Sequence, residues 1–364
     1  MQITKERLLL DLYIAFYDAR KGKSRRKYVI EFEEHLHENL VALRDAIYYR
    51  KYEQCPLVCF IITHPKKREV FASKFIDRIV HHLYFNYTHA LFENTFIYDC
   101  YSCIKGRGTS FGIDRLKYHI RSESRNYAKK CWVLKLDISS YFMSINRKKL
   151  LDIVLKRLDT EPFKQSTDTE LLKYLSVKII SKDPTNGCIM RSKPSDYAGM
   201  AKGKSLFNAP NGNGLPIGNL TSQLYSNVYL NLLDQFIKRK LKMKHYGRYV
   251  DDLFIVSKDK EKLLECVSKI RAFLKEELHL SLNEGKTIIN EVKRGVEFLG
   301  AYIKPWRTYI SNQCLRRIKT KLTIDIKMKT KEQLRQSFVS RLGFLKQFNS
   351  YNIARRIFYY NLAT

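Results

Sequence analysis

Two adjacent carboxylates, Asp251 and Asp252, are the residues of this chain best suited to chemistry. They lie in the segment HYGRYVDDLFIV, residues 245–256, and no lysine or arginine separates them. Adjacent carboxylates repel each other, so such a pair is favourable when a divalent cation neutralises it. The β-prone residues that follow predict a strand–turn–strand hairpin with the pair at its tip. Taken alone, such a pair in a turn is more often an ordinary acidic turn than a metal site.

A third carboxylate, Asp137, ends an apolar segment that is predicted to be a buried strand, WVLKLDISSYF at residues 132–142. A strand that ends on an aspartate can bring that carboxylate against a neighbouring hairpin. Mg²⁺ prefers oxygen ligands and usually keeps substrate phosphates in its shell. Two such ions can activate an attacking hydroxyl and stabilise a leaving pyrophosphate. The three aspartates together therefore predict a two-metal site.

The segment GLPIGNLTSQ, residues 214–223, lies between the two acidic segments. The order of the three segments resembles that of a reverse transcriptase. Retroviral and group II intron enzymes usually carry glutamine where this chain has Ile217, and proline where it has Gln223. The segment as it stands, with KSLF at residues 204–207 just upstream, resembles the reverse transcriptases of diversity-generating retroelements. The resemblance extends over roughly residues 60 to 305.

The resemblance implies an RNA-directed DNA polymerase that is error-prone and makes mutagenised cDNA from a template RNA, the mutagenic retrohoming of prokaryotes and phages. It implies that two Mg²⁺ ions, or Mn²⁺ in their place, are held by Asp137, Asp251 and Asp252, with Asp252 a less direct ligand. It also places Lys286 near the pyrophosphate, where its ammonium group can protonate the leaving group. For Lys286 an ordinary surface role is an equal alternative.

The resemblance further implies residues that bind the incoming nucleotide. Phe142 would pack under the sugar and exclude a ribose 2′-hydroxyl, unless it or its neighbour Tyr141 is merely core. Ile217 lacks the amide of glutamine, so we expect less strict alignment of the nascent pair and errors chiefly opposite template adenines. The basic turn at Lys66, Lys67 and Arg68, which is expected to enter a strand, would bind the triphosphate, although it is also one basic turn among many. The expected nucleotide-binding set is Lys66, Arg68 (with Lys67 beside them), Ile138, Phe142, Ile217, Gly218 and Gln223, and the expected primer grip is Phe298, Leu299 and Gly300.

The charge of the chain fits a nucleic-acid partner. Lysine and arginine number 67 against 36 acidic residues, a net charge of +31, which attracts a phosphate backbone. The 24 tyrosines and 20 phenylalanines offer stacking surfaces for unpaired bases, although most will be core. The family implies a template RNA, an RNA or DNA primer, deoxynucleoside triphosphates and a small basic accessory protein oligomer. Docking of that protein on so basic a chain requires acidic patches or bridging RNA.

Two alternatives stay open at this point. One is a reverse transcriptase of the retron or phage-defence type, against which Ile217 and Gln223 count. The other is a catalytically silent RNA-binding protein on a polymerase scaffold, against which the intact aspartates count. Zinc binding by Cys100 and Cys103 or by Cys55 and Cys59 is a minor reading, because the remaining cysteines, at 131, 188, 266 and 314, stand alone.

Nucleotide hydrolysis and membrane insertion are not supported by the sequence. The segments at residues 106–108 and 203–205 lack parts of a phosphate-binding loop. No run of about 18 apolar residues is present, and the N-terminus has no basic region followed by an apolar stretch. We therefore expect a cytoplasmic protein, and the resemblance implies a bacterial, archaeal or phage origin.

Hydrophobic periodicity predicts the elements that position these residues. Helices are expected at 4–20, 28–50, 73–93, 110–128, 148–158, 170–181, 219–241 and 258–279, strands at 57–63, 132–137, 286–292 and 296–303, and helices over the last sixty residues. The pattern indicates an α+β fold. The resemblance makes it a right-hand polymerase, with an N-terminal helical extension (1–55), fingers (56–130), a palm of antiparallel sheet plus helices (131–305, with an irregular insertion at 183–213 that belongs partly to the fingers) and a helical thumb (306–364).

Overall fold

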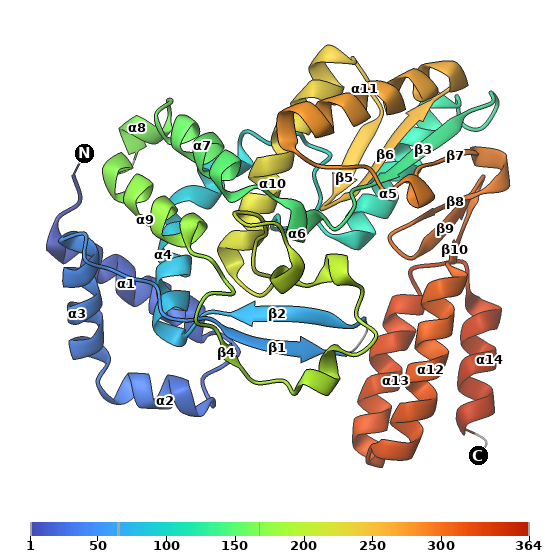
Figure 1. The fold of residues 1–364 in the computed structure, drawn as a ribbon. Helices are drawn as coiled ribbons and strands as arrows, with labels where there is room; N and C mark the ends of the chain where they lie inside the picture. The colour runs from blue at the N-terminus through green and yellow to red at the C-terminus, as the bar shows by residue number, and fades with distance from the viewer. Residues whose placement is uncertain (1, 64–65, 167, 363–364) are drawn as a thin grey trace. The chain divides into compact units, whose positions relative to one another are not determined.

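The protein is described by a computed structural model over residues 2–63, 66–166 and 168–362. The chain forms two compact units whose segments alternate along the sequence, and Figure 1 labels the helices and strands. Unit 1 contains residues 1–98, 138–236 and 270–281. Unit 2 contains residues 99–137, 237–269 and 282–364. The alternation means that each unit is assembled from segments distant in sequence, so local pattern alone does not define either one.

Unit 1 is mainly helical, with one small sheet. α1 packs on α3 and α4, and α4 packs on α10. The amphipathic N-terminal helices therefore share one core with α10, the helix that begins within the segment at residues 214–223. The sheet has the order β2-β1-β4, with β1 and β2 antiparallel. Its elements are α1 (Lys5–Arg20), α2 (Lys27–Glu34), α3 (Leu36–Tyr48), β1 (Val58–Ile62), β2 (Arg68–Ala72), α4 (Phe75–Glu93), α6 (Tyr141–Ser144), α7 (Arg147–Leu158), α8 (Phe163–Ser166), α9 (Thr169–Ser181), β4 (Ile189–Met190) and α10 (Leu220–Gln235).

Unit 2 is built on an antiparallel sheet of order β5-β6-β3-β7. Its central strands are near-continuous apolar runs because the sheet is covered, and Val133, Leu134, Phe254 and Ile255 are fully buried. α5 packs against β5 and β6. The bounds are α5 (Thr109–Glu123), β3 (Trp132–Asp137), β5 (Tyr246–Tyr249), β6 (Asp252–Ser257) and β7 (Ile288–Glu291).

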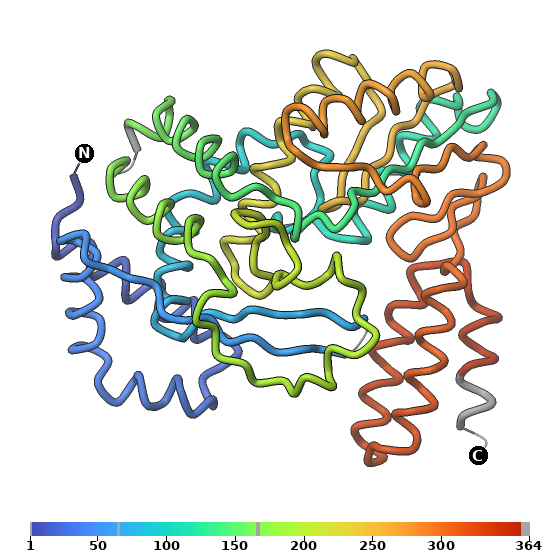
Figure 2. The backbone as a smooth tube through the Cα atoms, in the orientation of Figure 1, coloured from blue at the N-terminus to red at the C-terminus, as the bar shows by residue number. Residues whose placement is uncertain are grey.

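The C-terminal part of unit 2 adds a second sheet and a group of helices. β8 (Val296–Phe298), β9 (Ala301–Lys304) and β10 (Arg307–Ile310) form a meander, and α12 (Asn312–Met328), α13 (Lys331–Leu345) and α14 (Tyr351–Leu362) follow. The tube of Figure 2 shows these three helices running side by side in orange and red. Phe338, Leu345 and Phe348 are buried in a core shared with the sheets of unit 2. The C-terminal helices therefore present an apolar face to that core.

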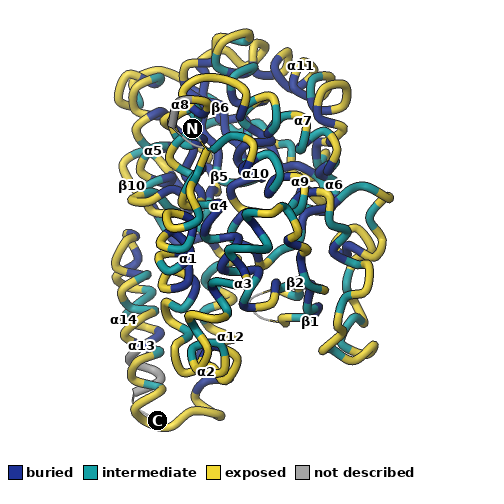
Figure 3. Tube along the Cα trace, turned by 90° about the vertical axis from the view of Figure 1, so that its left-hand side faces the viewer, coloured by how far each residue is buried: buried dark blue, intermediate teal, exposed yellow. Residues whose placement is uncertain are grey.

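The helix α11 (Lys260–Leu278) shows the amphipathic pattern that predicted it. Buried Leu263, Ile270 and Leu274 recur at helical spacing among exposed residues, which gives the mixed blue and yellow tube of α11 in Figure 3. Among the described residues, no helix is both long enough and apolar enough to cross a lipid bilayer.

Two predicted helices are shorter than expected. The helix predicted at 28–50 is interrupted at His35, which leaves helical geometry, and Asn39 caps the freed carbonyl of Phe32 with its side-chain amide. The helix predicted at 110–128 ends at Glu123, because three consecutive residues at 125–127 take positive φ and cannot continue a right-handed helix. Local periodicity does not register either backbone reversal.

Three further predictions, all in the C-terminal half of the chain, need correction. The strand predicted at 296–303 is a hairpin, since Leu299 and Gly300 take positive φ and turn the chain between β8 and β9. Residues 307–310 form β10 rather than helix, where they pair with β9. The helix predicted at 219–241 ends as α10 at Gln235 and continues as one π-helical turn, Phe236–Lys240. The predicted irregular character of 183–213 is confirmed, apart from the short β4 and single 3-10 turns.

Candidate active site

The strand register brings the three aspartates together at one end of the unit 2 sheet. Asp137 lies directly opposite Asp252 in the antiparallel pairing of β3 with β6. Tyr249 pairs with Asp252 across β5 and β6, so Val250 and Asp251 form a two-residue turn. Opposed residues in an antiparallel pair point to the same face, with Cβ atoms about 5 Å apart. The predicted hairpin is therefore present, with Asp251 in its turn and Asp252 as the first residue of β6.

Two side chains from the segment just before β7, the other strand that pairs with β3, hold Asp137. Lys286 donates from Nζ to Asp137 Oδ2 at 2.8 Å, and Asn283 donates from Nδ2 to the same oxygen at 3.0 Å. The backbone N of Asn283 also donates to the Asp137 carbonyl at 2.8 Å. Partial burial alone would lower the pKa of Lys286, but the hydrogen bond and charge of Asp137 raise it above its ordinary value. Lys286 is thus a firmly protonated ammonium at this carboxylate.

Asp251 is in the opposite electrostatic position. Burial, together with the negative charges of Asp252 and Asp137, raises the pKa of Asp251 to about 7, although Lys286 opposes the shift. A carboxylate at physiological pH that is this reluctant to ionise lacks sufficient positive charge around it. The turn therefore has a local excess of negative charge that a bound cation would relieve.

The donor set fits a hard divalent cation. Carboxylate oxygens from two strands, Asp137 on β3 and Asp252 on β6 with Asp251 in the turn, are the ligands that Mg²⁺ prefers. Within the described ranges, no three His, Cys, Asp or Glu side chains already enclose a metal position. Mg²⁺ that is bound by carboxylates usually keeps waters and substrate phosphate oxygens in its shell.

Aromatic packing supports the hairpin from below. Phe254 of β6 is fully buried, and its ring meets Phe298 edge-on with centroids 5.2 Å apart. Tyr101 stacks on Phe254 at 6.4 Å. Of the expected primer-grip residues, Phe298 is core, while Leu299 and Gly300 form the half-buried turn between β8 and β9. The structure thus places Phe298 in packing and leaves the turn accessible.

In unit 1, the glycine-rich loop (residues 214–223) is joined to the β1–β2 hairpin. Phe71 donates its backbone N–H to the Ile217 carbonyl at 2.9 Å. Gly218 has φ 132°, and a Cβ there would lie 2.9 Å from Val70 Cγ1 and 3.0 Å from the Phe71 carbonyl. Glycine is therefore required at 218 by both conformation and close approach. Ile217 packs partly buried on the neighbouring apolar cluster, and Gln223 is exposed on the first turn of α10.

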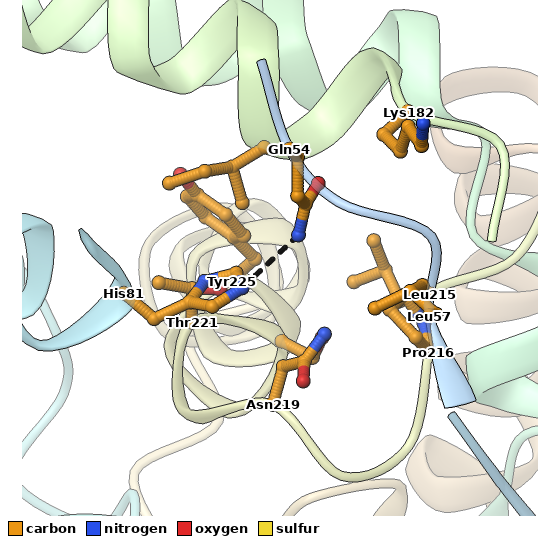
Figure 4. Close-up of a pocket in the computed structure, with 11 residues that line it drawn as sticks. Gln54, Leu57, His81, Lys182, Leu215, Pro216, Asn219, Thr221 and Tyr225 are labelled. Atoms are coloured by element: carbon orange, nitrogen blue, oxygen red, sulfur yellow. Dashed lines mark hydrogen bonds between the residues drawn. The ribbon is translucent and has the colours of Figure 1, made fainter. Parts of the chain in front are cut away.

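A buried polar network fixes the end of this loop, and its centre is His81 of α4 (Figure 4). His81 Nδ1 lies 2.8 Å from Thr221 Oγ1, and Nε2 lies 3.0 Å from Ser73 Oγ and 3.2 Å from Gln54 Nε2. Asn219 Oδ1 accepts from both the N–H and the hydroxyl of Ser73. Burial lowers the pKa of His81 to about 3, so the imidazole is neutral. Adjacent His82 takes no part in these bonds.

The two aromatic residues after Asp137 have different environments. Tyr141 is buried, and its hydroxyl donates to the Ser226 carbonyl at 2.6 Å. Phe142 is half-buried, and its carbonyl accepts from Leu215 N of the glycine-rich loop at 2.8 Å. Ile138 is buried. Of the pair, Tyr141 is therefore the core residue and Phe142 is the one accessible to a ligand.

The basic residues at the start of β2 are accessible. Lys66 and Arg68 are exposed, and Lys67 is half-buried with Nζ donating to the Ala198 carbonyl at 2.6 Å. Their neighbours His64 and Pro65 lie outside the described residues. Exposed cations at a strand end are suited to phosphate, but this arrangement alone does not separate that role from an ordinary basic turn.

Sequence reasoning missed three residues that organise these segments: Asn283, Arg248 and His81. Asn283 comes three residues before Lys286 and holds the same carboxylate. Arg248 directly precedes the acidic hairpin turn and is fully buried. A buried arginine or histidine looks like any polar residue in sequence. Arg248 directly precedes the acidic motif, which is a local signal, whereas no neighbouring motif marks His81.

Comparison with known proteins identifies a family. The family model "Reverse transcriptase (RNA-dependent DNA polymerase)" matches residues 65–303, which is more than half of the chain. "Protein YkfC" of Escherichia coli strain K12 is 24% identical over 295 residues, covering 72% of this chain and 70% of that protein. The "Putative COX1/OXI3 intron 2 protein" of Saccharomyces cerevisiae is 25% identical over 221 residues, covering 50% of this chain and 25% of the yeast protein.

The fold also matches a solved structure. Apo telomerase from Candida tropicalis has a TM-score of 0.52 at 10% identity, over 78% of this chain and 51% of the telomerase chain. The expected α+β architecture of a right-hand polymerase, with fingers, palm and helical thumb, is confirmed. The chain spans about a quarter of the yeast protein and about half of the telomerase chain.

Proposed function

We propose that this chain, which belongs to the reverse transcriptase (RNA-dependent DNA polymerase) family, synthesises DNA on an RNA template at the aspartates of the unit 2 sheet. The observation that carries the proposal is the register of β3 and β6, which sets Asp137 opposite Asp252 with Asp251 in the adjoining turn. The raised pKa of Asp251 adds an electrostatic argument, since the turn is short of positive charge. A silent RNA-binding scaffold would have no need of this arrangement.

Members of this family generally use divalent metal ions, and we assign two Mg²⁺ ions, replaceable by Mn²⁺, to Asp137, Asp251 and Asp252. When bound, the ions supply charge stabilisation for phosphoryl transfer. Asn283 and Lys286 orient the Asp137 carboxylate through its Oδ2. The Lys286 side chain is 62% exposed, and its raised pKa keeps the ammonium protonated, so it is able to give a proton to a departing pyrophosphate.

The nucleotide-binding assignments rest on the unit 1 segments. Exposed Lys66 and Arg68 supply cations for the triphosphate, and half-buried Phe142 supplies the ring that excludes a 2′-hydroxyl. Gly218 allows close backbone approach beside Ile217. We assign Leu299 and Gly300 to the primer grip, because they form an accessible turn above buried Phe298. As part of the same proposal we keep the domain limits expected from the sequence, with the palm at residues 131–305.

We further assign the chain to the diversity-generating retroelement type, on the residues that carried the resemblance, Ile217 and Gln223. Ile217 offers an aliphatic surface where an amide would hydrogen-bond, which favours misincorporation opposite template adenine. The expected partners are a template RNA, an RNA or DNA primer and a small basic accessory protein oligomer, and the net charge of +31 supports the nucleic-acid part of this set.

The test is primer extension by the purified protein on a defined RNA template with Mg²⁺, with products sequenced and Asp251→Asn assayed in parallel. Asparagine keeps the size of the side chain and removes its charge, so we expect extension to fall by about 10³-fold or more, the scale of a lost charge-stabilising group in phosphoryl transfer. Errors concentrated opposite adenine support the diversity-generating type.

Three other outcomes each decide something. Accurate extension keeps the polymerase and rejects the diversity-generating type in favour of a retron or phage-defence type. Extension that survives in Asp251→Asn rejects the proposed site. If neither protein extends, the assay is repeated with the cognate RNA and accessory protein, and continued inactivity supports the silent RNA-binding alternative.

A further inference from the structure

Arg248 is an arginine with no exposed surface, placed directly before the acidic hairpin turn. Guanidinium groups remain charged in proteins, so complete burial requires nearby acceptors. One of these acceptors is the carbonyl of Val250, to which Nη1 donates at 3.0 Å, and Nη2 lies 3.5 Å from Cys100 Sγ. The arginine therefore bonds to the turn from inside the fold.

The turn that it contacts has an unusual conformation. Val250 has φ 54° and is the first residue of the two-residue turn between β5 and β6. Turns with a positive φ at this position normally have glycine there, because a Cβ is unfavourable. Valine is branched at Cβ, which makes positive φ a marked outlier. Something outside the turn must hold this conformation.

The hydrogen bond from Arg248 acts at the right atom. The Val250 carbonyl belongs to the peptide that continues into Asp251, so fixing this carbonyl fixes the plane from which the Asp251 side chain departs. The backbone of Arg248 is itself anchored, since its N–H donates to the Asp99 carbonyl at 2.9 Å and its carbonyl accepts from Tyr101 N at 3.0 Å. Asp99 in turn accepts from Arg115 Nε at 2.7 Å. The support is thus continuous from α5 to the turn.

We propose that Arg248 is a positioning residue that holds the strained Val250 turn and thereby sets the Asp251 carboxylate for metal binding. The inference rests on the proposed function only for its catalytic readout. Its metal-binding readout is independent of that function. Arg248 touches neither substrate nor reacting atoms in this role, and acts through the peptide between Val250 and Asp251.

The test is a double-mutant cycle between Arg248→Met and Val250→Gly. Methionine retains a long apolar stem and removes the donors, so the strained turn should relax and kcat should fall by about 10²-fold, the cost of a misplacement of about 1 Å. Glycine adopts positive φ without strain. The double variant should therefore recover at least tenfold of the loss, whereas a purely packing role for Arg248 predicts no recovery.

The second readout is metal binding by the free protein, measured as the Mg²⁺-dependent increase in melting temperature. We expect the half-saturating Mg²⁺ concentration to increase in Arg248→Met and to return toward the wild-type value in the double variant. Arg248→Lys, which keeps a charge without the planar fork, provides the same cycle if the methionine variant does not fold. If Arg248→Met causes the same loss of activity and of Mg²⁺ binding whether residue 250 is valine or glycine, the inference is overturned. Failure of the wild type to extend any primer would instead count against the proposed function and leave the metal readout valid.

Discussion

The acidic hairpin of unit 2 and the glycine-rich loop of unit 1 differ in how far the protein itself neutralises or hydrogen-bonds their polar side chains. In the hairpin, Asp251 stands among like charges, and its pKa is raised to about 7. In the loop, the polar side chains of Asn219 and Thr221 are buried and bonded to Ser73 and His81. Both segments were recognised as motifs in the sequence, yet one is electrostatically incomplete and the other is satisfied internally.

The difference indicates how each segment serves the proposed reaction. An incomplete charge set costs stability and is retained where a ligand completes it. A satisfied buried network resists deformation and suits a segment that must present backbone to a substrate. Substitutions in the hairpin should therefore affect activity more than stability, and substitutions in the loop's support should affect stability more than activity.

Beyond the aspartates, a large effect is expected at Lys286, where the contrast between the two regions predicts loss of activity without loss of fold. Lys286→Ala removes a proton donor and the cation on Asp137, so the extension rate should fall by about 10²-fold, the lower range for a lost general acid. The side chain is 62% exposed, so the melting temperature should hardly change. Single-turnover extension across pH is the measurement. Lys286→Arg is the matched control, because it restores charge with a much higher pKa, and equal rates for the alanine and wild-type proteins would remove Lys286 from the chemistry.

The reverse pattern is expected at His81. His81→Phe keeps an aromatic ring and leaves Ser73 and Thr221 without their partner, which should lower the free energy of unfolding by about 2–4 kcal/mol. Chemical denaturation gives this value, and His82→Phe on the same helix is the control. A variant as stable as wild type would mean that the network does not support the loop.

The same substitution should alter the pH dependence of stability. The pKa of His81 is lowered to about 3 in the fold, so between about pH 3 and 6.5 the unfolded chain binds a proton that the folded chain does not. The stability from neutral His81 is complete above about pH 6.5 and is lost as the pH falls through that window. His81→Phe should flatten this part of the profile, which denaturation at pH 5 and pH 7 will show.

These two regions also show how far sequence reasoning reaches. The strand that ends at Asp137 and the turn at Val250 and Asp251 were predictable, because apolar runs interrupted by acidic residues are a local signal. The opposition of Asp137 and Asp252 depends on register, which the residues alone did not fix and the family order supplied. The His81 network was not predictable, since its members come from four separate segments. Leu299 and Gly300 were recognised as a motif and still predicted within a strand, because two positive φ angles leave little trace in periodicity.

A smaller effect is expected on the stability of the metal-free protein. Because the folded pKa of Asp251 is about 7 against an ordinary 3.8, the fold retains a proton that the unfolded chain releases, and stability falls as pH rises through this window. Asp251→Asn abolishes that penalty, so at pH 8 its melting temperature should exceed that of wild type by about 2–4 °C. Added Mg²⁺ should raise the melting temperature of wild type more than that of the variant. A variant that melts below wild type at pH 8 would contradict the description of the hairpin as short of positive charge.

The smallest effect is expected at Ile217, at the edge of the loop. Ile217→Gln adds an amide of similar size next to Gly218, and it should lower misincorporation opposite adenine severalfold, as expected for a gain of about 1 kcal/mol in discrimination from one hydrogen bond. Ile217→Leu separates the effect of polarity from that of packing, because Ile217 also contacts the apolar cluster around Phe71. Sequencing of extension products gives the error spectrum. If the glutamine and leucine variants change the error spectrum equally, the shape of the side chain at 217, rather than the missing amide, sets fidelity. The loop would then resemble the hairpin, as a segment whose side chains act directly on the substrate.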